Sequence, residues 1–147
     1  EISAHAQPGR ASLHNLNYWQ FGDYLGIGAG AHGKQRVHNG IVRRHKIRHP
    51  ERYMNVIEGD EVVATDNHIP TAELVTEYML NALRLRDGFS PAAFVASTGL
   101  ALDSPAFAQP LTEALERGWL ERADGNIRPS AIGFRFLNDL QLLFAGN

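Results

Sequence analysis

The sequence predicts an α+β protein whose first part is built from short strands and whose second part is mainly helical. Hydrophobic residues make up 44% of the 147 residues and charged residues 20%, as in ordinary globular proteins. Before Pro70, short apolar stretches of strand length are separated by glycines, whereas after Pro70 apolar residues recur at helical spacing. We therefore expect two domains, one over residues 1–69 and one over residues 70–147.

The first part contains four apolar stretches that we predict to be strands and one stretch that we predict to be a helix. The predicted strands are residues 2–6, 24–28, 40–42 and 54–57. The predicted helix covers residues 15–21 and ends at Gly22. Strands this short, with one or two helical turns, bury too little apolar surface to offset the chain entropy. This part is therefore expected to need a partner.

The second part begins with three predicted helices. Residues 71–88 place their apolar side chains on one face, behind a threonine that can cap the helix. A short helix follows over residues 90–99, with proline in its first turn and glycine at its end. The third helix covers residues 104–117, and because Pro110 lies inside it, the helix either begins later or kinks there.

A hairpin and a last helix complete the predicted second part. Asp124 and Gly125 lie between two short apolar stretches, 119–122 and 127–129, which is a hairpin signal. Ser130 can cap a final helix, which extends to Phe144. The order of three helices, a hairpin and a helix is typical of a winged-helix domain.

A winged-helix domain commonly reads DNA with its third helix, so we tested this function against the charges. The helix over residues 104–117 carries Arg117 as its one cation, together with Glu113 and Glu116. Residues 53–147 contain six Lys or Arg and thirteen Asp or Glu. Since each phosphate contact needs a cation, we expect no DNA binding by this domain.

The charge of the first part has the opposite sign. Residues 1–52 contain eight Lys or Arg and three Asp or Glu, and seven of these cations lie between Lys34 and Arg52. We interpret this basic stripe as a solvated face or a protected strand edge. A site for phosphates or porphyrin propionates is the alternative.

The composition excludes several classes of protein. The chain contains no cysteine, so by itself it forms no disulfide, thiolate zinc site or iron–sulfur cluster. No apolar run approaches the roughly 20 residues that cross a bilayer, and the first residues do not resemble a signal peptide. A cytoplasmic location is therefore expected.

A glycine-rich segment, GAGAHGKQ at residues 28–35, matches two phosphate-binding patterns. Gln35 lacks the hydroxyl that a P-loop uses for magnesium, and the residues after it do not form a helical apolar face. We therefore reject both patterns. Two interpretations stay open: a strand that another backbone approaches closely, or one that contacts a flat ligand.

The segment HNLNYW at residues 14–19 is the other dense group of functional side chains. His14 can ligate haem iron, and Tyr18 and Trp19 offer flat faces suited to a porphyrin. The alternative is a hydrogen-bonded histidine at the edge of a core. His45 and His49 have the spacing of a zinc pair but no supporting helix, so we expect no zinc site.

Together these segments resemble a known family. Residues 1–9, 14–19 and 23–33 are similar to the C-terminal part of proteins related to oxygen-independent coproporphyrinogen III oxidase. The HNxxYW pattern at residues 14–19 is similar to that of the HemW haem-chaperone branch, and residues 71–144 resemble the family's C-terminal helical domain.

The resemblance implies a radical S-adenosylmethionine protein whose partial (β/α) barrel holds a [4Fe-4S] cluster on an upstream C-x3-C-x2-C loop. Residues 1–69 would then be the last strands of that barrel with a basic connecting segment, followed by the C-terminal domain. This piece is expected to hold no cofactor and to be inert by itself, because it lacks the cluster. With the rest of the barrel absent, the strands of residues 1–33 are expected to pair with another copy, rearrange or stay poorly ordered.

The resemblance also implies roles for individual residues in the intact protein. Residues at the barrel mouth, on the side of S-adenosylmethionine or substrate, are expected to be Gly28, Ala29, Gly30, Ala31 and His32. Haem contacts are expected from His14, Asn15, Tyr18 and Trp19, with His14 on the iron. Haem delivery and coproporphyrinogen oxidation both stay open, and a standalone winged-helix module that recruits a protein or nucleic acid is the alternative.

Overall fold

The computed structural model describes residues 5–7, 9–56 and 62–145, and contacts within the chain divide it into two compact units. One unit is Asp23–Pro70, and the other combines Glu1–Gly22 with Thr71–Asn147. The first 22 residues thus group with the helices of the second part, whereas the sequence analysis assigned them to the domain 1–69. The assignment of residues 1–69 to the end of a barrel stays a prediction.

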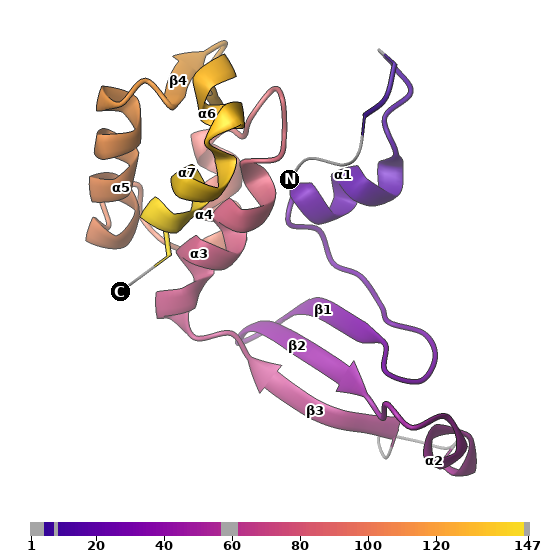
Figure 1. Ribbon diagram of the computed structural model, residues 1–147. Coiled ribbons are helices and arrows are strands. Elements are labelled where there is room, and N and C mark those ends of the chain that lie inside the picture. The colour runs from indigo at the N-terminus through magenta and orange to yellow at the C-terminus, as the bar shows by residue number, and fades with distance from the viewer. Residues whose placement is uncertain (1–4, 8, 57–61, 146–147) are drawn as a thin grey trace. The chain divides into compact units, whose positions relative to one another are not determined.

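Both units contain helices and strands (Figure 1). The unit 23–70 contains β1 (His32–Val37), β2 (Gly40–Lys46), α2 (Pro50–Asn55) and β3 (Val63–His68). The other unit contains α1 (Leu13–Trp19), α3 (Thr71–Ala82), α4 (Pro91–Thr98), α5 (Pro105–Glu116), β4 (Leu120–Ala123), β5 (Asn126–Pro129), α6 (Ala131–Arg135) and α7 (Leu137–Leu143).

The unit 23–70 is built on an antiparallel sheet in the order β1-β2-β3 (Figure 1). A two-residue connection, His38 and Asn39, joins β1 to β2, and the register runs from Val37 opposite Gly40 to His32 opposite His45. The strand predicted over residues 40–42 is confirmed and extends to Lys46. Most of the basic stripe therefore belongs to a β-hairpin.

Two predicted strands in this unit are wrong. Over residues 24–28 the structure has one isolated bridge, in which Tyr24 and Lys34 exchange hydrogen bonds of 2.8 and 3.0 Å. Residues 25–27 belong to no strand, and Gly28 has a φ of 98°, a turn conformation. The other wrong prediction covers residues 54–57, where Pro50 and Glu51 instead begin α2, which ends at Asn55. Residue 57 lies outside the described residues.

Of the other elements predicted before Pro70, the helix is confirmed and the first strand cannot be assessed. The helix predicted over residues 15–21 is present as α1 and begins two residues earlier. The strand predicted over residues 2–6 falls mostly on residues 1–4, which lie outside the described residues, and residues 5–7 belong to no regular element. Strand β3 was not predicted.

The three helices predicted after Pro70 are present, but the first, α3, ends at Ala82 and not at Gly88. Helix α4 begins at a cap in which the Ser90 hydroxyl accepts from the Ala93 N–H at 3.1 Å. It ends at Gly99, whose φ of 70° is left-handed. Helix α5 begins at Pro105 and continues through Pro110, so it does not begin late.

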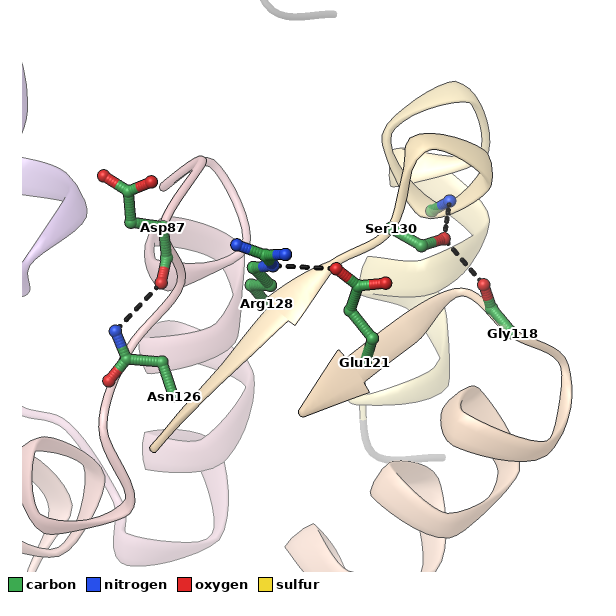
Figure 2. Close-up of polar contacts among 7 residues, drawn as sticks. Asp87, Gly118, Glu121, Asn126, Arg128 and Ser130 are labelled. Carbon is green, nitrogen blue, oxygen red and sulfur yellow. Dashed lines mark hydrogen bonds and ion pairs between the residues drawn. The ribbon is translucent and has the colours of Figure 1, made fainter. Parts of the chain in front are cut away.

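The predicted hairpin is also present, and polar contacts surround it (Figure 2). Asp124 and Gly125 both have positive φ, as a tight hairpin turn requires. The Arg128 guanidinium pairs with Glu121 across the strands at 2.8 Å, and the Ser130 hydroxyl donates to the Gly118 carbonyl at 2.6 Å (Figure 2).

The final helix is divided into two, which the sequence analysis did not predict. The same Ser130 hydroxyl accepts from the Gly133 N–H at 3.0 Å and so caps α6. The backbone leaves the helical region at Phe136, with φ −107° and ψ 34°, before α7 begins. Gly133 lies against the Trp119 carbonyl, where a side chain would not fit.

The core of the helical unit is a cluster of aromatic rings. Tyr78 of α3 contacts Phe21, Phe89 and Phe94 with ring centroids 5.3 to 5.5 Å apart. Phe94 of α4 stacks on Phe107 of α5 at 4.0 Å. Because Phe21 follows α1, this cluster joins the N-terminal segment to the helices after Thr71.

Candidate functional site

Helix α1 carries the first predicted site, and a left-handed residue ends it. Phe21 has φ 62°, which is uncommon outside glycine. The conformation reverses the chain so that the Gly22 N–H donates to the Asn17 carbonyl at 2.7 Å. The Phe21 side chain is 2% exposed and contacts Tyr78, so the strained turn is held by the core.

The predicted haem contacts occupy adjoining positions of α1. His14 and Tyr18 are four residues apart, and their rings meet edge to face with centroids 4.7 Å apart. Asn15 and Trp19 have the same spacing on the neighbouring positions. Within α1 no side chain is fully buried, and His14 is exposed while Tyr18 and Trp19 are half-buried.

This arrangement suits a planar ligand that binds through an imidazole. The exposed His14 can offer a ring nitrogen, and the half-buried rings of Tyr18 and Trp19 supply apolar faces with polar edges. The contact with Tyr18 restricts the orientation of the His14 ring. The side chains of α1 thus place an exposed imidazole beside two half-buried aromatic rings.

The second predicted site, residues 28–32, lies in the unit 23–70 and is held by backbone hydrogen bonds. The Gly30 N–H donates to the Ile47 carbonyl at 2.8 Å, and the Ala31 carbonyl accepts from the Lys46 N–H at 2.9 Å. Strand β1 begins at His32, so no helix follows the glycines. This agrees with the rejection of the two phosphate-binding patterns.

Close backbone approach explains one glycine near this segment. A side chain at Gly26 would collide with the backbone of His32. Gly28 and Gly30 instead have left-handed φ values of 98° and 70°. At Gly28 a side chain would meet nothing within 4 Å, so its glycine is required by the turn.

Sequence reasoning missed two residues of these regions. Phe21 anchors α1, and the earlier prediction treated it as part of a short helix. His45 faces His32 across β1 and β2, with ring centroids 3.9 Å apart. The dipeptide Asn39-Gly40 is a hairpin signal that could have predicted this pairing.

Two further findings limit the kind of site. Over residues 5–7, 9–56 and 62–145, no group of three or more His, Cys, Asp or Glu could hold a metal ion. In that same part of the chain, every helix is too short or too polar to cross a membrane.

Comparisons with known proteins cover nearly the whole chain. Residues 69–136 match the family model of the HemN C-terminal domain. Over 98% of its length, the chain is 37% identical to the haem chaperone HemW of Escherichia coli and 34% identical to that of Haemophilus influenzae. It spans only 37% and 36% of those two relatives.

A solved structure shows a similar fold. Coproporphyrinogen III oxidase (HemN) from Escherichia coli, described as a radical SAM enzyme, matches 84% of this chain with a TM-score of 0.56. The identity is 13%, and the match covers 28% of that protein. This likeness shows a shared mixed fold of helices and strands. The resemblance predicted from the sequence is confirmed by these comparisons.

Proposed function

The chain is homologous to the C-terminal region of HemW and HemN proteins, and we propose that it is the C-terminal part of a haem-handling protein of the HemW type. The observation that carries this proposal is the match to HemW over nearly the whole chain, including the helix that presents His14. Haem delivery is favoured over coproporphyrinogen oxidation because the HemW relatives are 34–37% identical, whereas the oxidase structure is 13% identical.

In this proposal α1 holds the haem. His14 would ligate the iron, and Asn15, Tyr18 and Trp19 would contact the porphyrin. The exposed imidazole and the adjoining half-buried rings support these roles. The segment Gly28–His32 lies, in the same proposal, at the barrel mouth near cofactor or substrate.

A [4Fe-4S] cluster and S-adenosylmethionine belong, in the proposal, to the longer protein. Cysteine thiolates hold such clusters, and this chain has none. Its residues therefore do not fit the cluster, and we assign it no step in radical chemistry. Its own contribution is to bind and orient the tetrapyrrole.

The finer features of the fold belong to the same proposal. We infer that the unit 23–70 continues a partial barrel and that the helical unit is winged-helix-like, which the order α3, α4, α5, β4, β5, α6 supports. We also infer that the helical unit does not bind DNA, because Arg117, directly after α5, forms an ion pair with Glu113. We infer a cytoplasmic protein.

The test is haem binding by the natural protein that contains these 147 residues. Hemin is added in steps and the Soret difference spectrum is recorded. We expect His14→Ala to weaken binding at α1 by roughly tenfold or more, as loss of ligation does. His38→Ala, which removes an imidazole from the connection between β1 and β2, is the matched control. Equal affinity of the parent and the His14→Ala variant contradicts the proposal.

A further inference from the structure

The segment that contains α1 carries one permanent charge. Residues 2–22 contain a single Lys or Arg, Arg10, and no Asp or Glu. Arg10 is exposed, and its guanidinium has no hydrogen bond or ion pair to any residue that the structure describes. This charge is therefore available to an anion from outside the chain, next to the helix that carries His14.

Local hydrogen bonds fix the backbone on both sides of Arg10. Before it, Gly9 has a φ of 74°, and the Arg10 N–H donates to the Gln7 carbonyl at 2.9 Å, so a turn ends at Arg10. After it, the Ser12 hydroxyl accepts from the Asn15 N–H at 3.4 Å and caps α1. Arg10 thus leads from a closed turn into the first turn of α1 (Figure 1).

Arg10 lies close enough to His14 for one haem to contact both residues. They are four positions apart, so their Cα atoms are at most about 14 Å apart. The capped helical turn that begins between them shortens this distance. A long arginine side chain and a propionate arm can together span what remains.

The side chains along α1 match the two chemically different edges of a haem. One edge carries two propionate carboxylates, and the opposite edge is uncharged. The cation lies before the first turn of α1, where His14 is, whereas the half-buried rings of Tyr18 and Trp19 lie in the last turn. With the iron on His14, the carboxylate edge would therefore point towards Arg10 and the uncharged edge towards the rings.

We propose that Arg10 is a positioning residue for the haem at α1, and that its guanidinium pairs with a propionate while His14 ligates the iron. The inference rests on the proposed haem-handling function. It adds the direction in which the haem lies along α1 and a preference for tetrapyrroles with free carboxylates. The planar guanidinium suits this role because it donates two parallel hydrogen bonds to one carboxylate.

The experiment compares hemin with hemin dimethyl ester, whose propionates are uncharged, in Soret titrations of the natural protein that contains these residues. The parent is expected to bind hemin roughly tenfold more tightly than the ester. Arg10→Ala is expected to bind both probes equally, and to bind the ester as tightly as the parent does. Arg10→Lys keeps the charge without the planar fork, so it is expected to recover part of the preference for hemin.

Two further variants separate this role from general effects of charge and folding. Arg122→Ala removes an exposed arginine of β4 in the same unit and is expected to leave the preference for hemin unchanged. Gly9→Ala is expected to reduce the preference, because alanine disfavours a φ of 74° and the turn that ends at Arg10 must change. A side chain at Gly9 would meet nothing within 4 Å, so this effect comes through the backbone.

The results distinguish failure of this inference from failure of the proposed function. If Arg10→Ala keeps the parent's preference for hemin while His14→Ala weakens binding of both probes, the role of Arg10 is overturned and the proposed function stands. Equal weakening of both probes by Arg10→Ala shows a structural role and overturns the pairing with a propionate. If His14→Ala binds hemin as tightly as the parent, both are overturned. An unchanged preference in Gly9→Ala overturns the role of the turn.

Discussion

Phe21 links the candidate haem helix to the core of the helical unit. Its ring is 2% exposed and contacts Tyr78 with centroids 5.5 Å apart. The backbone adopts a left-handed φ of 62°, which costs about 1–2 kcal/mol for a residue with a Cβ. Burial of the aromatic ring offsets this cost. Position 21 therefore determines where α1 and His14 lie in the unit.

Phe21→Ala is expected to lower the free energy of unfolding by about 3–5 kcal/mol, because a large ring leaves the core. Urea denaturation followed by circular dichroism measures the change. Leu13→Ala on the same segment is the control, since Leu13 is 82% exposed, and its effect is expected to stay within about 0.5 kcal/mol. Equal effects of the two substitutions would show that Phe21 is not an anchor.

Tyr78 makes the stability depend on pH in alkaline solution. Burial raises the pKa of the Tyr78 phenol well above its usual value of about 10. Above that pH the unfolded chain loses this proton while the folded chain keeps it, so the free energy of unfolding falls as pH rises. Below that pH the phenol is neutral in both states and contributes no slope.

Tyr78→Phe is expected to remove the part of the alkaline loss of stability that comes from the Tyr78 phenol. Thermal melts of the parent and the variant at several pH values between about 8 and 11 measure it. Tyr18→Phe is the comparison, because Tyr18 is half-buried on α1. If the melting temperatures of the parent and of Tyr78→Phe fall equally steeply as pH rises, the role of Tyr78 burial is contradicted.

Among the elements, the helices after Thr71 could be predicted because each has its own start and stop signals. Ser90 and Gly99 bound α4 through a side-chain cap and a left-handed residue, and both signals are local. The division between α6 and α7 could not be predicted in this way. It occurs where Gly133 lies against the Trp119 carbonyl, a contact that depends on tertiary packing.

The strands of residues 23–70 were harder to predict for a related reason. The apolar residues at 24–28 have the composition of a strand, yet the backbone pairs only at Tyr24. Three of the four residues 54–57 are apolar as well, but the proline at position 50 favours a helix that runs to Asn55. Composition over four or five residues does not separate these outcomes.

Gly88 and Gly99 have the same backbone conformation but differ in how closely other residues pack against them. Gly88 has φ 69° and Gly99 has φ 70°, but a side chain at Gly88 would collide with the Ile127 carbonyl. At Gly99 nothing lies within 4 Å. An alanine would therefore strain the backbone at both positions, but only at position 88 would it also collide with a neighbouring strand.

Gly99→Ala is expected to lower the free energy of unfolding by about 1 kcal/mol, the cost of a left-handed alanine. Gly88→Ala is expected to cost roughly 3 kcal/mol, because the bridge between Phe89 and Ile127 must also shift. Chemical denaturation of both variants checks the difference. Equal losses would show that the contact with β5 relaxes freely.

At the scale of the whole molecule, the sequence predicted the family and the location of α1, but not the grouping of the chain. Asp23–Pro70 is a unit inserted between two segments of the other. The pattern of apolar residues changes at Pro70 and shows no change at Gly22, so the first junction had no local signal. The contact between His14 and Tyr18 follows from their spacing of four residues on a helix, whereas the pairing of His32 with His45 needed the strand register.

The segment before β1 exposes two apolar side chains. Leu25 is 71% exposed and Ile27 is 89% exposed, and apolar side chains of this kind commonly seek a partner. We expect the chain to associate through this segment, because burying these two side chains against another copy removes apolar surface from water. Substitution of both residues by serine is expected to give a monomer in sedimentation velocity, with Leu13→Ser as the control. Unchanged association in the double variant would contradict this interface.

The claim on which the account depends is that His14 ligates haem iron, and rescue by free imidazole tests it most directly. In His14→Ala, the part of the Soret difference spectrum that depends on His14 is expected to disappear and to return when imidazole is added. Imidazole is expected to leave the corresponding spectrum of the parent protein unchanged. A His14→Ala spectrum identical to that of the parent before imidazole is added would contradict the account.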